Sequence, residues 1–312
     1  MNLAVVFGGT SREKEISIST GKAVLDALKN QNNVYPIDFK GNYNVLLEQI
    51  RSKNIDLVFN ALHGGDGEDG TFQLFLEQNN ICYTGSDSKS SRTAMNKDLT
   101  KRICLKNNIP TPKWDCFHLE DISKIDFNKL SDQFSDTCVI KPSREGSSIG
   151  MHILKSNQEK VDEFKIKNAI KEVLQISNKV IIEEYIQGRE LTVGILDEEA
   201  LPVVEIFPKG YFYDYSSKYT KGQCDYLIPA KLDKSDEIQV KKYALQLHKL
   251  VGCHSYSRVD FLMDIKSNIF VLEINTLPGL TNTSLLPKAT MGIGMSYLDT
   301  IQKIIELSSK KK

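Results

Sequence analysis

The sequence lacks an excess of charge, a long apolar run and a cluster of cysteines, and each absence excludes a class of protein. Its 40 basic residues balance 40 acidic ones, so no long-range field favours nucleic acid or an anionic membrane. No apolar run approaches the ~20 residues that a membrane helix needs, and the first residues do not have the pattern of a signal peptide. We therefore expect a cytoplasmic protein with neither nucleic acid nor membrane as a partner.

The six cysteines never fall at a C-x-x-C spacing, which argues against a zinc site or a redox dithiol. A chain of 312 residues, 40% hydrophobic and 26% charged, is long enough to fold around two or three cores without a disulfide frame. We expect an ordinary globular protein whose cysteines are buried thiols.

The two common nucleotide motifs, G-x-G-x-x-G and G-x-x-x-x-G-K-[ST], are also missing. The chain begins instead with a strand at Leu3–Phe7, a glycine turn and a helix, and further strands predict an open α/β sheet over the first ~85 residues. Ligands of such sheets bind at the carboxyl ends of the strands. Glu13 and His63 follow two of these strands, so we expect them to face one pocket, although the helix dipole alone favours Glu13 as a solvated acid in a first helical turn.

A second unit is predicted after the polar stretch 86–92, beginning with the helix that carries Lys97. Strands at 138–141 and 150–154 flank the small-residue loop 142–149. Such a loop can cover phosphates with its backbone N–H groups, while Lys97 and Lys141 supply positive charge. The alternative is an ordinary flexible hairpin.

The same loop contains a G-x-S-x-G pattern at 146–150, and the glycine-rich segment 63–65 is typical of an esterase oxyanion hole. The nucleophile of an esterase needs a helix directly after this pattern. Residues 151–154 alternate as a strand instead, so we do not expect Ser148 to be a nucleophile.

Acidic residues follow the next strands. The segments 180–185 and 191–196 are predicted strands, and Glu183 and Glu190 flank the turn between them. These carboxylates could accept hydrogen bonds from an adenine amino group and ribose hydroxyls, or be surface charges. The tyrosine-rich stretch 208–229 has neither helical nor strand periodicity, which predicts a lid.

Two strands near the carboxyl end, 257–263 and 269–275, alternate polar and apolar residues. If they pair as a hairpin, Asp260, Glu273 and Asn275 present hard oxygen atoms close together, which suits Mg²⁺ shared with a nucleotide's phosphates. The alternative is a hairpin with one solvated face. We favour the metal site.

Several motifs in order along the chain resemble the D-alanine:D-alanine ligase family of the ATP-grasp superfamily. They are residues 8–11 with 13 and 15, 63–70, 141–148, 213–215 with 218–219, 258–260, 273–276 with 278–281, and 284–285. The resemblance implies an α/β (α+β) ATP-grasp fold in which an N-terminal open parallel sheet precedes two antiparallel-sheet domains that clamp ATP. The implied domains are 1–88 for substrate, 89–180 with the phosphate loop, and 181–312 with the lid and the metal site.

The resemblance also implies roles for individual residues. The catalytic set would be Glu13, Ser147, Tyr219, Arg258 and Gly279. The ATP-binding set would be Lys97, Lys141, Ser148, Glu183, Glu184, Ile186, Glu190 and Lys218. The D-alanine substrates would contact Glu13, His63, Arg258, Gly279, Ser284 and Leu285. Two Mg²⁺ ions, for which Mn²⁺ can substitute, would be held by Asp260, Glu273 and Asn275.

The implied activity is the ATP-dependent joining of two D-alanine molecules, through a D-alanyl phosphate, for peptidoglycan synthesis. The implied assembly is a homodimer. Two residues depart from the family pattern, Glu184 in the adenine region and Leu277 before the glycine turn. The alternatives are another ATP-grasp carboxylate–amine ligase, a D-alanine:D-lactate ligase, and a nucleotide-binding regulator without turnover.

Overall fold

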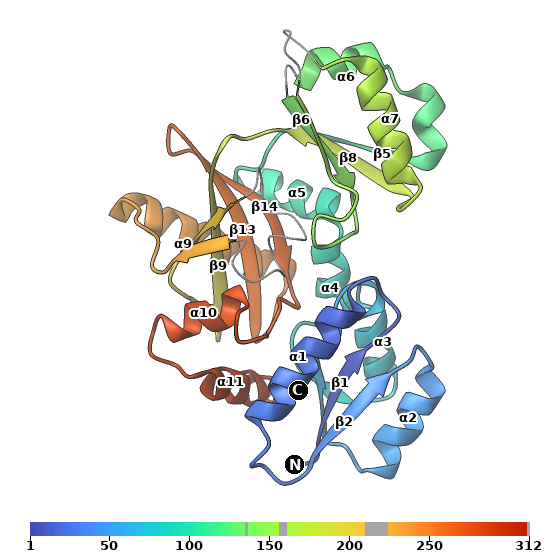
Figure 1. Cartoon of the computed structure of the whole chain (residues 1–312), viewed down its shortest axis with the longest axis vertical. Coiled ribbons are helices and arrows are strands. Elements are labelled where there is room, and N and C mark those ends of the chain that lie inside the picture. Colours follow the sequence, from blue (N-terminus) through green and yellow to red (C-terminus); the bar gives the residue numbers. More distant parts are fainter. Residues whose placement is uncertain (135–136, 156–160, 210–223, 311–312) are drawn as a thin grey trace.

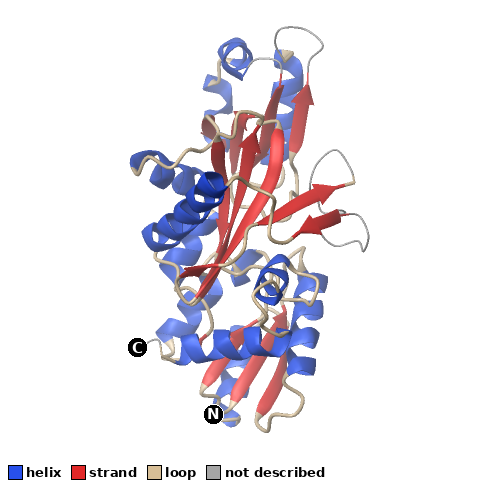
Figure 2. Cartoon of the chain, turned by 90° about the vertical axis from the view of Figure 1, so that its left-hand side faces the viewer, coloured by secondary structure: helices blue, strands red, loops and turns tan. Residues whose placement is uncertain are grey.

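Strands form three separate sheets in the computed structural model, which describes residues 1–134, 137–155, 161–209 and 224–310. The sheets follow one another along the length of the molecule, each with helices against it (Figures 1 and 2). The first sheet is parallel, and the other two are antiparallel. This arrangement confirms the predicted fold class.

The N-terminal sheet has the order β2-β1-β3-β4. Its strands are β1 (Leu3–Gly8), β2 (Val34–Phe39), β3 (Leu57–Asn60) and β4 (Cys82–Tyr83). The associated helices are α1 (Lys14–Ala27), α2 (Tyr43–Ser52) and α3 (Thr71–Gln78), with a short 3₁₀ turn, η1 (Gly65–Gly67). All four residues of β3 are buried, as expected for a parallel strand covered on both faces.

The central sheet has the order β5-β8-β6-β7. Its strands are β5 (Trp114–His118), β6 (Thr137–Pro142), β7 (His152–Lys155) and β8 (Lys179–Glu184). The accompanying helices are η2 (Leu119–Lys124), α6 (Phe127–Phe134) and α7 (Glu163–Leu174). Because β8 pairs with both β5 and β6, we propose that the second domain boundary follows Glu184 and not residue 180.

The C-terminal sheet has the order β12-β11-β9-β13-β14, with β10 on β9. Its strands are β9 (Gly188–Leu196), β10 (Glu199–Ala200), β11 (Val204–Pro208), β12 (Cys224–Leu227), β13 (Tyr256–Asp264) and β14 (Ile269–Asn275). The predicted pairing of the last two strands as a hairpin is confirmed.

Several helices contact this third sheet. Among the described residues they include α4 (Ser88–Met95), α5 (Lys97–Lys106), α9 (Lys234–Val251) and α10 (Leu285–Met291). Cys104 of α5 is buried with Val259 and Val271 in one hydrophobic cluster. The helix that carries Lys97 therefore follows the first domain in sequence but joins the core of the C-terminal sheet.

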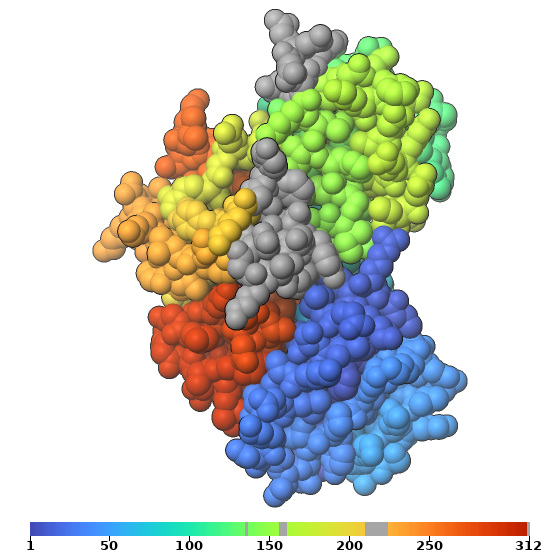
Figure 3. Space-filling model, in the orientation of Figure 1, coloured from blue at the N-terminus to red at the C-terminus, as the bar shows by residue number. Residues whose placement is uncertain are grey.

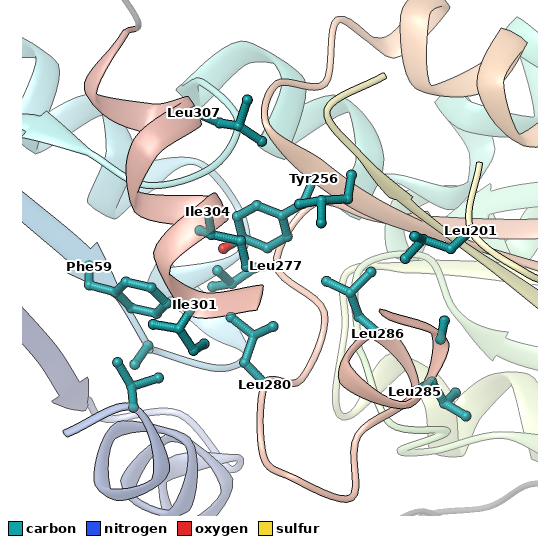
Figure 4. Close-up of a cluster of buried hydrophobic side chains, with 14 of the residues drawn as sticks. Phe59, Leu201, Tyr256, Leu277, Leu280, Leu285, Leu286, Ile301, Ile304 and Leu307 are labelled. Atoms are coloured by element: carbon teal, nitrogen blue, oxygen red, sulfur yellow. The ribbon is translucent and has the colours of Figure 1, made fainter. Parts of the chain in front are cut away.

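A second cluster joins the two ends of the chain. Phe59 of β3 packs with Tyr256 and with Ile301 and Ile304 of α11 (Tyr297–Ser309), and α10 (Leu285–Met291) adds Leu286 (Figure 4). The space-filling view shows the blue N-terminal lobe in direct contact with the red C-terminal segment, while the green central lobe lies at the other end (Figure 3). The N-terminal and C-terminal sheets thus share one core, and the central sheet has its own.

The expectation of buried thiols is correct for three cysteines and wrong for a fourth. Cys104, Cys138 and Cys224 are buried, whereas Cys82 on the short strand β4 is exposed. Helix α9 is too polar to cross a membrane, and among the described residues no other helix has the length and apolarity for it.

Replacing Ile301 by alanine tests the shared core. Ile301 is fully buried between the two sheets, so we expect Ile301→Ala to lower the free energy of unfolding by about 2–5 kcal/mol, through lost burial and the cavity that remains. Leu298 lies on the same helix but is 38% exposed, so Leu298→Ala should cost much less. Denaturant unfolding measures both, and equal losses would contradict the shared core.

Candidate active site

Two neighbouring cavities contain the predicted site residues that the structure describes. The first, of about 430 Å³, lies between the central and C-terminal sheets, and the second, of about 290 Å³, lies between the N-terminal and C-terminal sheets. Gly146, Ser147 and Glu273 line both. The predicted residues that line the first are Lys97, Lys141, Ser147, Ser148, Glu183, Glu184, Ile186, Glu190, Asp260 and Glu273. Those that line the second are Glu13, His63, Ser147, Arg258, Glu273, Asn275, Gly279, Ser284 and Leu285.

A buried carboxylate at the wall of the first cavity is paired with two lysines. One oxygen of Glu183 accepts a hydrogen bond from Lys141, and the other lies 2.9 Å from Nζ of Lys101 on α5. Burial of Glu183 favours its neutral form, but the two ammonium groups outweigh this effect and lower the pKa of Glu183 to about 2. The carboxylate is therefore ionised at neutral pH.

The start of α5 places Lys97 between the phosphate loop and the C-terminal hairpin. Asn96 caps the helix by accepting from the backbone N–H of Leu99. Nζ of Lys97 donates to the carbonyl of Glu145 at 2.7 Å and lies 3.3 Å from Oε2 of Glu273. One ammonium group thus links the loop to the acidic end of the cavity.

The loop between β6 and β7 has an unusual backbone. Ser147 and Ser148 have φ values of +49° and +59°, a left-handed conformation that costs a non-glycine residue about 1–3 kcal/mol and is commonly found at functional sites. The Ser147 hydroxyl donates to Oε1 of Glu13. A strand, β7, follows the loop, so Ser148 is not on the strand-to-helix turn that a serine esterase requires.

Glu13 and His63 face the second cavity, as the sequence predicted. Both are only 5% exposed. His63 is oriented by two contacts, with Nε2 2.9 Å from Oγ1 of Thr20 and Nδ1 3.4 Å from Oε1 of Glu68. A Cβ on Gly64, which has φ +63°, would lie 2.6 Å from Oε2 of Glu13, so the backbone approaches this carboxylate as closely as glycine permits.

The opposite wall of the second cavity comes from the segment after β14. The backbone N–H of Thr281 donates to Oγ of Ser284 at 3.0 Å, which closes a turn at the start of α10. A Cβ on Gly279 would lie 2.9 Å from the same Oγ atom. The turn therefore brings the Ser284 hydroxyl close to the backbone of Gly279, which carries no side chain.

The hairpin β13–β14 brings the three predicted metal ligands together. Asp260 is opposite Glu273, and Arg258 is opposite Asn275. Asp260 accepts two hydrogen bonds from Arg258, at 2.8 and 2.7 Å, and one from Asn275 at 3.1 Å.

This donor set suits a hard divalent cation, because two carboxylates and an amide supply oxygen ligands at one end of both cavities. Thr192 also donates to Asp260, at 2.6 Å. With Arg258 and Asn275 it uses all four lone-pair directions of the Asp260 carboxylate, so a cation at Asp260 would displace one of these donors. Within the described chain no three His, Cys, Asp or Glu residues cluster as a metal site; here the third ligand is an amide.

Two predicted residues, Lys218 and Tyr219, lie outside the described residues, as does most of the predicted lid. The two departures from the family pattern are described. Glu184 lines the first cavity, and its backbone N–H donates to the carbonyl of Lys113. Leu277 is 6% exposed and packs in the core shared by the two sheets, so much of its side chain fills space between domains.

Lys101 and Thr192 stand in no motif that points to the site, although each contacts a predicted site residue. One signal for Lys101 was present. Lys97 and Lys101 are four residues apart on one helix, so both side chains lie on the same face.

A buried carboxylate on α5 connects this helix to the central sheet. Asp98 accepts hydrogen bonds from Lys179 of β8 at 2.8 Å, from the indole of Trp114 on β5 at 2.9 Å, and from Arg102 at 3.1 Å. Burial raises the pKa of Asp98, but these hydrogen bonds outweigh burial and lower it below the ordinary value.

We expect Asp98→Asn to lower the free energy of unfolding by about 1–3 kcal/mol at pH 7, because the charge-assisted hydrogen bonds are lost. Since the folded pKa is lowered, this contribution is present above the unfolded value of about 3.9 and is lost as the pH falls through the folded value. Denaturant unfolding at pH 7 and at about pH 3 should therefore show a smaller difference at the lower pH. Asp26→Asn, at a residue whose side chain is 78% exposed, is the control and should change little at either pH.

Comparison with known proteins gives a consistent result over the whole chain. A family model described as "D-ala D-ala ligase C-terminus" matches residues 103–306, and one described as "D-ala D-ala ligase N-terminus" matches residues 43–86. The D-alanine–D-alanine ligase of Aquifex aeolicus is 42% identical, over 98% of this chain and 100% of its own length. That of Carboxydothermus hydrogenoformans is 39% identical, over 98% of each chain.

Solved structures agree. The D-alanine–D-alanine ligase of Bacillus anthracis complexed with ATP superposes with a TM-score of 0.84 at 32% identity, and covers 99% of this chain and 97% of that one. The VanG D-Ala:D-Ser ligase of Enterococcus faecalis superposes with a TM-score of 0.80 at 28% identity, over 99% of this chain and 100% of that one.

Proposed function

The chain belongs to the D-alanine–D-alanine ligase family, and from this premise we propose how its two cavities divide the reaction between them. The enzyme is a D-alanine–D-alanine ligase. The first cavity binds ATP, and the second binds the two D-alanine molecules. The observation that carries this proposal is that the two cavities share Ser147 and Glu273, so a phosphate in one is adjacent to a carboxylate in the other.

The chemistry of the first cavity supports ATP. Its wall carries Glu183, an ionised acceptor suited to an adenine amino group, while Val139, Ile153 and Leu272 supply apolar surface for the base. The ammonium groups of Lys97 and Lys141 line the same cavity and suit phosphate oxygens. ATP is also the ligand named for the related Bacillus anthracis structure.

The second cavity supports two amino acids. The buried Glu13 carboxylate is a counterion for the ammonium group of the first D-alanine, and Ser147 fixes its orientation. The turn at Ser284 and Leu285 offers a hydroxyl and the N-terminus of α10 to the carboxylate of the second D-alanine. The two substrates then lie on opposite walls, with Arg258 and Gly279 lining the same cavity.

The Asp260, Glu273 and Asn275 oxygens would hold Mg²⁺, or Mn²⁺ in its place, with Arg258 releasing part of its contact with Asp260. Bound there, the cation would neutralise phosphate charge that the lysines leave uncompensated. Two ions remain the expectation from the resemblance.

The reaction follows from these positions. The first D-alanine carboxylate attacks the γ-phosphate in line, while Lys97 and Lys141 reduce the negative charge at the transferred group. D-alanyl phosphate and ADP result. The deprotonated amine of the second D-alanine attacks the carbonyl of D-alanyl phosphate, and Arg258 and the Gly279 backbone N–H stabilise the oxyanion, each such donor being worth about 3 kcal/mol. Phosphate leaves as the amide bond forms.

We further propose a homodimer that acts in the cytoplasm in peptidoglycan synthesis, as in the family. Tyr219 and Lys218 would close the site from the lid. D-Alanine is proposed for the second subsite as well as the first. A D-serine product is the second candidate, because the D-Ala:D-Ser ligase has the same overall fold.

The direct test incubates the purified enzyme with ATP, Mg²⁺ and D-alanine, and measures phosphate release and dipeptide formation. We expect both with D-alanine alone, and much slower mixed product with D-serine or D-lactate as a second substrate. Phosphate release that requires a different carboxylic acid would support another carboxylate–amine ligase. Nucleotide binding without turnover would support a regulator.

We expect Glu273→Gln to reduce turnover by more than about 100-fold with the fold intact, because losing even an outer partner of a metal ligand typically costs 10–100-fold. The control is Glu172→Gln, which removes the charge of an exposed carboxylate on α7 and should leave turnover unchanged. Circular dichroism checks the fold, and titration of Mg²⁺ checks the mechanism. A folded Glu273→Gln enzyme with normal turnover and an unchanged Mg²⁺ requirement would refute this metal assignment.

A further inference from the structure

Lys101 is one of the most buried charged residues in the described chain, and it touches neither cavity. It is 1% exposed, and it does not line either cavity. Its ammonium group donates to Oγ1 of Thr111 at 2.8 Å and lies 5.5 Å from the centre of the Trp114 ring. A lysine in such a place needs a compensating interaction, because removing an ammonium group from water costs free energy.

The ion pair between Lys101 and Glu183 provides this compensation. Oε2 of Glu183 is 2.9 Å from Nζ of Lys101, and Oε1 is bonded to Lys141. Burial lowers the pKa of Lys101, whereas the Glu183 carboxylate raises it, so the ion pair opposes the effect of burial on the lysine. Of the two lysines, only Lys141 lines the cavity.

Lys101 and Lys141 therefore differ in whether they can leave Glu183 to contact a nucleotide in the cavity. Lys141 is on β6 at the cavity wall, and in the proposed complex its ammonium group serves the phosphates of ATP. As Lys141 turns toward the phosphates it leaves Glu183, which without Lys101 would be a buried carboxylate lacking a counterion. Lys101 is enclosed by Thr111, Pro112 and Trp114 and stays with Glu183.

We infer that Lys101 is a positioning residue for nucleotide recognition: as the permanent counterion of Glu183 it holds that carboxylate toward the adenine amino group and leaves Lys141 available to the phosphates. This inference rests on the proposed ATP site in the first cavity. Lys101 contacts no substrate and acts only through Glu183.

The test compares ATP with ITP, which has a carbonyl oxygen where adenine has its amino group. Lys101→Met keeps the length of the side chain and removes the charge. We expect KM for ATP to rise by about 10-fold to 100-fold, the usual cost of losing a charge-assisted hydrogen bond, and the preference for ATP over ITP to fall. KM for D-alanine should change by less than about twofold, since the second cavity is not involved.

Two further variants separate positioning from packing. Lys106→Met removes an exposed lysine from the same helix. It should have the same KM for ATP and the same preference for ATP over ITP as the parent enzyme. Glu183→Gln should by itself reduce the preference for ATP. Once Glu183 is replaced by Gln there is no carboxylate for Lys101 to hold, so the double variant Lys101→Met/Glu183→Gln should be no worse than the more impaired single variant.

The outcomes are distinct. An unchanged KM for ATP and an unchanged preference for ATP over ITP in folded Lys101→Met would overturn the inference. Equal increases in KM for ATP and in KM for D-alanine would also overturn it, as would effects on KM for ATP that add in the double variant. If Lys101→Met does not fold, the double variant carries the test, because it removes both buried charges; a KM for ATP well above that of Glu183→Gln would contradict the role. If Glu183→Gln itself keeps full preference for ATP, the proposed adenine contact is wrong, and the inference about Lys101 fails with it.

Discussion

Carboxylates at and around the first cavity are paired with cationic side chains, and the structure depends on this pairing. Glu183 has Lys101 and Lys141, Glu273 has Lys97, and Asp98 has Lys179. An unpaired charge in the protein interior typically costs several kcal/mol. Helix α5 contributes Lys97, Asp98 and Lys101 to these pairs. This one helix therefore joins the central sheet to the C-terminal hairpin, and the first cavity lies where they meet.

The distribution of the hydrophobic cores explains how the site can be both rigid and accessible. The N-terminal and C-terminal sheets share one core through α11 (Figure 4), so Glu13 and Ser284 are held on opposite walls of one packed body. The central sheet has a separate core around α7. Polar contacts from α5, such as Asp98 with Lys179, and the contact of Ser147 with Glu13 connect it to the rest. Such contacts can reform after small movements more easily than interlocked apolar side chains can.

Local patterns predicted many of the elements, but they missed strand β12, which lies in the stretch 208–229 that was expected to have no strand. They also indicated part of the candidate site. Alternating residues placed Asp260 and Glu273 on one face of a hairpin, since successive side chains in a strand point to opposite faces, and the pairing in the structure brings them opposite each other. The strand after the G-x-S-x-G pattern was correctly recognised, which removed the esterase alternative. The resemblance to a family added what periodicity cannot supply, namely which polar residues share a ligand. The roles of the individual site residues remain proposals, and Lys218 and Tyr219 lie outside the described residues.

The sequence by itself determined many of the strands and helices and the residues that each of these strands turns toward a common face, because these depend on neighbours a few positions apart. Only the tertiary structure decided that α5 packs on the C-terminal sheet, that β8 extends the central sheet beyond residue 180, and that Lys101 neutralises Glu183. These features depend on side chains that are far apart along the chain, and burial makes their contacts strong. A lysine in a polar helix is usually solvated, and the fold alone shows that this one is enclosed.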